Sequence, residues 1–100
     1  MKILVTGGSG KVGGHVVNEL EKGHELRIFD MMSPEEGPHK RKSSHGFVKG
    51  DLLNPDNIKK ALEGMDAVAH LAANPWFSPT TFLTNAVGTY NMLEGCRELG

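Results

Sequence analysis

A glycine-rich segment near the start of the chain has the residue types and spacing that suit contact with a phosphate. Its spaced glycines are Gly7, Gly10 and Gly13, and they follow the apolar run 3–5. Gly7 permits a tight turn, Gly10 lets the backbone approach a phosphate without a Cβ, and Gly13 lets a helix pack closely on the strand. The N–H groups of a first helical turn have no partner inside the helix, so they attract an anion. Alone, the segment is equally typical of an ordinary turn.

The residues around these glycines predict a strand before them and a helix after them. A hydrophobic strand ends at Thr6, and a helix begins near Lys11 and stops at Gly23. Apolar residues recur at near-helical spacing in this helix, and they are Val12, Val16, Val17 and Leu20. A glycine loop between a strand and an amphipathic helix is the context that a dinucleotide-binding motif requires.

An acidic residue at the end of the next predicted strand favours one dinucleotide over another. The strand 26–29 ends in Asp30, which comes 23 positions after Gly7, near the ~20-residue offset expected of a ribose-binding carboxylate. Such a carboxylate accepts hydrogen bonds from both adenosine ribose hydroxyls but repels a 2′-phosphate, so it favours NAD over NADP. Two alternatives stay open: Asp30 could be a solvated acid at a strand end, and the basic residues 40–42 could fold back toward it.

The middle of the chain predicts a long loop followed by regular elements. The stretch 33–46 is polar and punctuated by proline and glycine, which is typical of a surface loop. We interpret its basic triplet Lys40–Lys42 as plain solvation of this loop, with contact to a cofactor phosphate or a partner as the alternative. The remaining predicted elements are a strand 47–49, a helix that begins at Asn54-Pro55 and stops at Gly64, and a strand 67–71.

Strands that alternate with helices predict an α/β fold of the Rossmann type. Right-handed crossovers place four parallel strands in the order 3-2-1-4, with helices on both faces of the sheet. Ligands of such sheets bind over the carboxyl ends of the strands, here at the crevice between strands 1 and 4. The small pair Ala72-Ala73 follows the fourth strand and leaves room there, opposite the glycine loop. A last helix from Ser78-Pro79 to Gly100 is apolar over more than one face.

Composition narrows the class of protein. The chain has 100 residues, a formal net charge of -1 and 38% hydrophobic residues, which predicts one compact soluble domain without a nucleic-acid partner. No apolar run approaches the ~20 residues that span a bilayer, and a strand follows Met1-Lys2 directly, so we expect a cytoplasmic protein without a membrane partner. The only cysteine, Cys96, is expected in the core, and the five histidines show no metal-ligand spacing. No metal site is expected.

Four blocks of the chain together resemble a known family. They are Thr6 to Gly13, which is similar to a T-G-G-x-G-x-x-G loop, Gly50-Asp51-Leu52, an acid-containing turn, His70-Leu71-Ala72-Ala73, an H-x-A-A block, and Asn85 with Gly88-Thr89 and Asn91, an N-x-x-G-T-x-N helix. This pattern resembles the NAD-dependent epimerases and dehydratases of the extended short-chain dehydrogenase/reductase family, which act largely on nucleotide sugars. The resemblance implies NAD as cofactor and an oxidoreductase, isomerase or lyase activity in nucleotide-sugar metabolism.

The resemblance also implies roles for individual residues. Beside the three glycines, the pyrophosphate would be lined by Ser9, Lys11 and Val12. The adenine would contact Asp51 and Leu52, the ribose and pyrophosphate would contact Leu71, Ala72 and Ala73, and Asn85 would help hold the region near the nicotinamide half. Each has a structural alternative: Asp51 could form a turn, Asn85 could be a satisfied polar group of a helix, and His70 is interpreted as a core histidine rather than a catalytic one.

The chain departs from the family pattern at its catalytic residues. The family uses a Tyr-x-x-x-Lys pair, in which the lysine lowers the tyrosine pKa for proton transfer during hydride transfer. The only tyrosine here is Tyr90, with Glu94 four places later, and no lysine occurs after Lys60. We therefore predict that residues 1–100 are an incomplete NAD-binding Rossmann domain, inactive alone, with sugar binding only in a full-length parent.

Two further expectations follow from this incompleteness. A non-catalytic NAD(P)-binding module with a regulatory or interaction role is the alternative function. One edge of the fourth strand is expected to lack a neighbour, which exposes unpaired backbone groups. The resemblance implies a homodimer through the C-terminal helix, although missing intrachain neighbours would explain the apolarity of that helix equally well.

Overall fold

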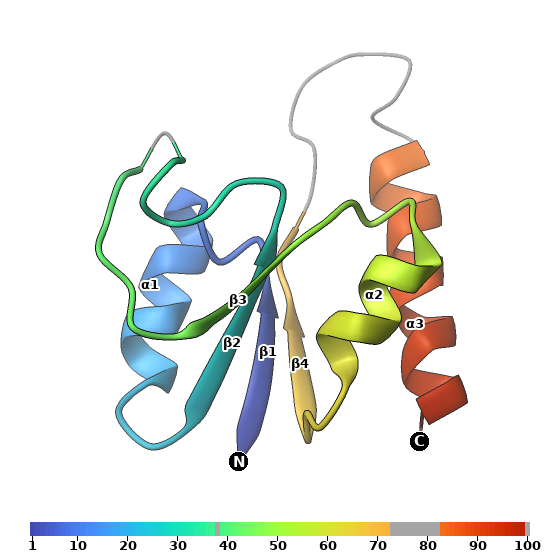
Figure 1. Cartoon of the computed structure of the whole chain (residues 1–100), viewed down its shortest axis with the longest axis horizontal. Coiled ribbons are helices and arrows are strands. Elements are labelled where there is room, and N and C mark those ends of the chain that lie inside the picture. The colour runs from blue at the N-terminus through green and yellow to red at the C-terminus, as the bar shows by residue number, and fades with distance from the viewer. Residues whose placement is uncertain (38, 73–82, 100) are drawn as a thin grey trace.

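The strands of this chain form a parallel sheet. The computed structural model describes residues 1–37, 39–72 and 83–99. In these residues the strands are β1 (Lys2–Thr6), β2 (Glu25–Asp30), β3 (Gly46–Lys49) and β4 (Ala67–His70). They pair in parallel in the order β3-β2-β1-β4 and point the same way in Figure 1. The predicted strand order and fold class are confirmed.

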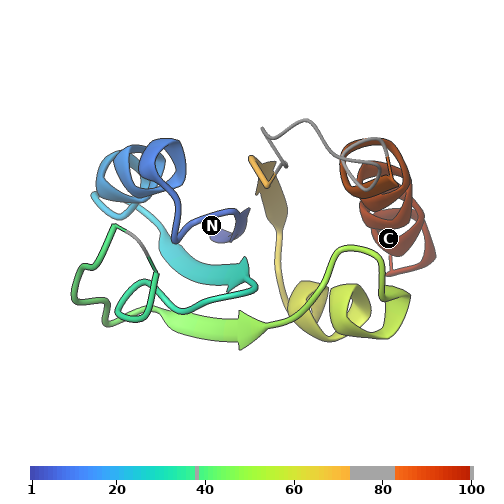
Figure 2. The ribbon, with the colours of Figure 1, turned by 90° about the horizontal axis from the view of Figure 1, so that it is seen from above.

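Helices cover both faces of the sheet. Helix α1 (Lys11–Leu20) lies on one face, whereas α2 (Pro55–Leu62) and α3 (Gly88–Leu99) lie on the other (Figure 2). A π-helical turn, η1 (Leu83–Val87), leads into α3. None of the helices in the described part of the chain has the length and apolarity that crossing a membrane requires. The predicted start of the last helix at Ser78-Pro79 lies outside the described residues.

Alternation along β1 builds two separate cores. Successive side chains of a strand point to opposite faces, so Ile3 and Val5 meet Val17 of α1, whereas Leu4 joins the core that contains Ile58 of α2. Leu4 and Val5 are both 0% exposed. Both faces of β1 are covered, so a continuous apolar sequence is what this strand requires.

Helix α3 is buried through two glycines and one methionine. The buried residues of the described α3 are Gly88, Met92 and Gly95, and a Cβ built at Gly88 would lie 2.9 Å from Cβ of Leu52. The side chains of Tyr90 and Leu93 are instead 61% and 65% exposed. Gly95 lets the backbone of α3 approach α2, and Gly88 lets it approach Leu52 in the turn before α2. Hydropathy alone does not detect this mode of packing.

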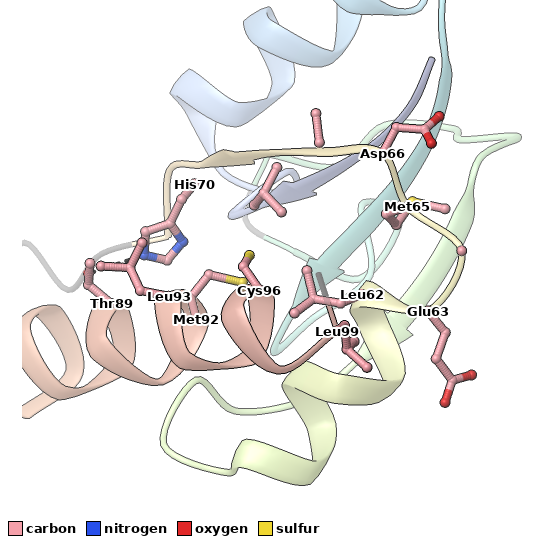
Figure 3. A pocket seen from close by; sticks show the side chains of 13 residues that line it. Leu62, Glu63, Met65, Asp66, His70, Thr89, Met92, Leu93, Cys96 and Leu99 are labelled. Atoms are coloured by element: carbon pink, nitrogen blue, oxygen red, sulfur yellow. Dashed lines mark hydrogen bonds between the residues drawn. The ribbon is translucent and has the colours of Figure 1, made fainter.

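A groove of about 770 Å³ lies between β4 and α3 (Figure 3). Its lining includes Val68, His70, Met92, Leu93, Cys96 and Leu99. Strand β4 stands at the edge of the sheet, as the sequence predicts, and α3 packs against α2 on the far side of the groove. Strand β4 is consequently only half-buried along its length, although its apolar sequence without alternation is typical of a strand that is covered on both faces.

Candidate functional site

The turn after β1 requires glycine at its first position. Gly7 has φ 73°, and a Cβ there would lie 2.8 Å from the backbone nitrogen of Ala72. A residue with a side chain would be strained at this positive φ, and its Cβ would clash with the backbone of Ala72. Gly7 also donates its N–H to the carbonyl of Phe29 at 2.9 Å. The structure thus brings the glycine loop and the end of β4 together at the predicted crevice.

The start of α1 is uncapped by any side chain. Gly10 is its N-cap residue and makes no side-chain hydrogen bond, so the first N–H groups of α1 face outward as an anion-binding end. A Cβ at Gly13 would overlap the carbonyl oxygen of Gly7. Gly13 therefore lets α1 pack on the turn itself, whereas we expected contact with the strand.

Two residues near the start of α1 lie on its outer side. Lys11 is exposed, and Val12 is 65% exposed. Val12 was expected to belong to the apolar stripe of α1, but its side chain lies outside the core. Val17 is the valine that the core buries, at 5% exposure. The predicted contact of Lys11 and Val12 with a pyrophosphate stays a prediction.

Ser9 and Asp30 are joined across the loop. The N–H of Ser9 donates to Oδ2 of Asp30 at 3.2 Å, and the N–H of Met31 donates to Oδ1 at 2.7 Å. The hydroxyl of Ser9 donates to the carbonyl of Met32 at 2.7 Å, and Ser9 is 3% exposed. The structure places the acid against the glycine loop, as the spacing predicts, but directs the serine side chain toward the segment after β2.

The predicted adenine contacts have structural roles of their own. The Asp51 carboxylate accepts the N–H of Leu53 at 2.9 Å, so the turn-forming role that the sequence left open is present. Leu52 is 6% exposed and packs in the core shared by α2 and α3. Its carbonyl accepts from the side-chain amide of Asn91 at 3.0 Å. Adenine contact by Asp51 and Leu52 remains untested.

The end of β4 is held by a threonine hydroxyl. The N–H groups of Leu71 and Ala72 donate to Oγ1 of Thr6 at 3.0 and 3.2 Å. Thr6 is 0% exposed, whereas Leu71 is 37% exposed. The predicted site residue Ala73 lies outside the described residues. Thr6 opens the T-G-G motif, yet its role in fixing the second wall of the crevice was not predicted from the sequence.

A chain of hydrogen bonds connects Thr6 with the turn before α3. Because Oγ1 of Thr6 accepts two backbone N–H groups, its proton is directed to Nδ1 of His70 at 2.7 Å. His70 then carries its own proton on Nε2, which lies 3.2 Å from Oγ1 of Thr89 (Figure 3). Thr89 donates onward to the carbonyl of half-buried Asn85 at 2.6 Å. His70 is therefore a neutral, structural histidine, and burial lowers its pKa.

Acidification below about pH 6.5 is expected to destabilise the fold through His70. Burial lowers the pKa of His70 below its ordinary 6.5, so between the two values the unfolded chain binds a proton that the folded chain excludes. Stability is full above the unfolded pKa, falls as the pH drops through it, and levels off below the folded pKa. Thermal melts between roughly pH 7.5 and 5 measure this fall.

The control for this pH dependence is His70→Gln, which keeps a donor and an acceptor but does not titrate. The fall should be smaller in the variant, and an identical profile would contradict the assignment. Glu36 and Glu94 do not interfere, because hydrogen bonds from Ser33 and Arg97 lower their pKa values below 4.5, outside this window.

The basic triplet of the long loop is not uniformly solvated. Lys40 and Lys42 are exposed as expected, but Arg41 is half-buried. Its guanidinium donates to the carbonyls of Gly8 at 2.9 Å and Gly10 at 3.1 Å. The prediction of a simply solvated triplet is therefore wrong for Arg41, because the segment that carries this residue folds back onto the glycine loop. No local sequence signal predicts this contact across 33 positions.

The assembled site suits a dinucleotide better than a metal. The uncapped start of α1 offers N–H donors to a pyrophosphate, and the Asp30 carboxylate beside it offers acceptors to ribose hydroxyls. Within the described residues, no group of three or more His, Cys, Asp or Glu side chains is placed to hold a metal ion.

Comparison with known proteins identifies the family whose model matches this chain. The model of the "NAD dependent epimerase/dehydratase family" matches residues 3–100. Sterol-4-alpha-carboxylate 3-dehydrogenase, decarboxylating, of Mus musculus is 36% identical over 103 residues, covering 99% of this chain and 27% of that protein.

Solved structures agree with this match. A short-chain dehydrogenase/reductase superfamily protein of Agrobacterium tumefaciens with bound NAD superposes with a TM-score of 0.85 at 30% identity, covering 100% of this chain and 30% of that one. The Thermus thermophilus UDP-glucose 4-epimerase complex with NAD gives 0.82 at 28% identity, covering 98% and 34%. This chain therefore spans roughly a third or less of these relatives.

Proposed function

Because this chain belongs to the NAD dependent epimerase/dehydratase family, we propose that it is the NAD-binding part of an enzyme of that family. One observation carries the proposal: the uncapped start of α1 lies beside the carboxylate of Asp30, which accepts the N–H of Ser9 within the loop. Hydrogen-bond donors for a phosphate and acceptors for ribose hydroxyls are thus adjacent. Gly7 also lies close to the backbone of Ala72, so the segment after β4 is next to the same loop.

The residues proposed to hold NAD are those that the sequence predicts. The pyrophosphate would lie against the loop and the start of α1, the adenosine ribose against Asp30, and the nicotinamide half toward Asn85. The full set is Gly7, Ser9, Gly10, Lys11, Val12, Gly13, Asp30, Asp51, Leu52, Leu71, Ala72, Ala73 and Asn85. When bound, NAD supplies a nicotinamide ring that accepts a hydride.

The proposed reaction begins with hydride removal from a hydroxyl-bearing carbon of the substrate. The named relatives act on different substrates, a sterol carboxylate in one and UDP-glucose in another. Our proposal keeps a sugar or nucleotide sugar as the substrate. In a full-length parent, parts of the protein other than these 100 residues would bind this substrate and supply the Tyr-x-x-x-Lys pair. A homodimer through α3 belongs to the same proposal, because Tyr90, Leu93 and Leu99 are exposed on that helix.

Calorimetry on the full chain tests the cofactor assignment. NAD and ADP-ribose are expected to bind with similar affinity, and nicotinamide mononucleotide much more weakly, because the loop and Asp30 contact the adenosine and pyrophosphate part. NADP should bind at least tenfold more weakly than NAD, since the carboxylate repels its 2′-phosphate. Folded protein that binds neither NAD nor ADP-ribose at millimolar concentration would overturn the proposal.

A further inference from the structure

We propose that Arg41 is a positioning residue that holds the glycine loop in its cofactor-binding shape, and that Gly14 is the residue that makes room for it. The inference rests on the proposed NAD site but concerns residues outside it. The guanidinium donates from Nη1 to the carbonyl of Gly8 and from Nη2 to the carbonyl of Gly10. Two carbonyl groups of the glycine loop are thereby tied to one rigid, planar group.

Fixing these carbonyls also fixes the N–H groups that follow them. The peptide unit is planar, so the carbonyl of Gly8 sets the direction of the N–H of Ser9, and the carbonyl of Gly10 sets that of Lys11. The Ser9 N–H is the group that donates to Asp30. The Lys11 N–H is the first of α1, at its anion-binding end. Arg41 therefore orients a donor at each of the two places where the cofactor is proposed to bind.

Gly14 has no other evident reason to be glycine. It follows the three glycines of the phosphate motif, lies inside α1 and is buried, and glycine inside a helix costs roughly 1 kcal/mol relative to alanine. A Cβ at this position would overlap the guanidinium of Arg41. The guanidinium of Arg41 thus occupies the space that a side chain at position 14 would fill. The hydrogen bonds of Arg41 offset the helix-weakening effect of Gly14.

The loop that carries Arg41 is itself folded against the site. Arg41 donates its N–H to the carbonyl of Pro34 at 2.9 Å, and Gly37 donates to Ser33 at 2.9 Å. A Cβ at Gly37 would lie 3.5 Å from the carbonyl oxygen of Ser9. These contacts restrict the conformation of the segment that carries Arg41. The guanidinium therefore orders the glycine loop at a reduced entropic cost.

A double-mutant cycle on the full chain tests the inference, with NAD and NADP affinities from calorimetry and Tm as readouts. Arg41→Ala removes the guanidinium, and Gly14→Ala displaces it while improving helix propensity. Each change should weaken NAD about tenfold. The double variant should be no weaker than Arg41→Ala alone, because both changes remove one interaction. Arg41→Lys should recover part of the loss.

The matched control is Lys42→Ala, which removes an equal charge from an exposed neighbour and should leave affinity unchanged. Equal losses for NAD and NADP support positioning, whereas a loss confined to NADP would make Arg41 a phosphate ligand and overturn the inference. A fall in Tm without a change in affinity, or additive losses in the cycle, would overturn it as well. If the unaltered chain binds no NAD, the proposed function itself fails, a result distinct from those three.

Discussion

Alanine at Gly13 is expected to weaken NAD binding by roughly a hundredfold, about 2.7 kcal/mol. The added Cβ would overlap the carbonyl oxygen of Gly7 and approach Cα of Gly8 to 2.9 Å. These are backbone atoms of a tight turn and cannot move aside as a flexible side chain can, so α1 must shift away from the turn. Its first N–H groups would then no longer meet the pyrophosphate. Calorimetry with NAD measures the loss.

The same change should lower the Tm by at least roughly 5 °C, because overpacking costs about 1–3 kcal/mol. Gly23→Ala is the matched control, since a Cβ there meets nothing within 4 Å and Gly23 is not among the positive-φ glycines. Its Tm and its NAD affinity should stay unchanged. Normal NAD affinity in Gly13→Ala would show that the loop tolerates displacement and would remove it from the proposed site.

The second large effect is expected at Asp30, where loss of the carboxylate changes the choice of cofactor. Asp30→Asn should weaken NAD by roughly 10- to 100-fold, because hydrogen bonds to a charged group contribute about 1.5–3 kcal/mol. NADP should be affected less or bind better, since the charge that repels its 2′-phosphate is gone. The ratio of the two dissociation constants is the measurement.

Asp30→Ala extends this test to the internal role of the carboxylate. It also leaves the N–H groups of Ser9 and Met31 without their acceptor, so it should lower the Tm, whereas Asp30→Asn keeps one acceptor and should lower it less. Glu35→Gln removes a charge from an exposed position in the following loop and serves as the control. An unchanged ratio of NAD to NADP affinity in both Asp30 variants would disprove the assignment.

The sheet and its helices were predictable because short-range patterns encode them. The apolar run of β1 predicts a buried strand, and its residues are buried in two separate cores. Asn54 accepts the N–H of Asp56 at 3.0 Å as the predicted cap of α2. Strand order then followed from the handedness of the crossovers, and the structure confirms it.

The packing of α3 was less predictable for a physical reason. The sequence shows a helix that is apolar over more than one face, which does not identify its contact face, whereas a helix that approaches its neighbour closely needs small residues at the contact. Gly88 and Gly95 provide it, because a Cβ at either position would lie 2.9 Å from a leucine side chain. Which face of a helix packs depends on its partner, and the partner is distant in sequence.

By itself, the sequence determined the elements, the order of the strands and the glycines that the turn after β1 requires. These depend on local sterics and periodicity, which a short stretch of chain contains completely. Only the tertiary structure showed that Arg41 reaches Gly8 across 33 positions and that Thr6 meets His70 across 64. Such contacts depend on the path of a loop and the register of a sheet. The composition of a polar segment predicts that it forms a loop, but it does not predict which distant residues its side chains contact.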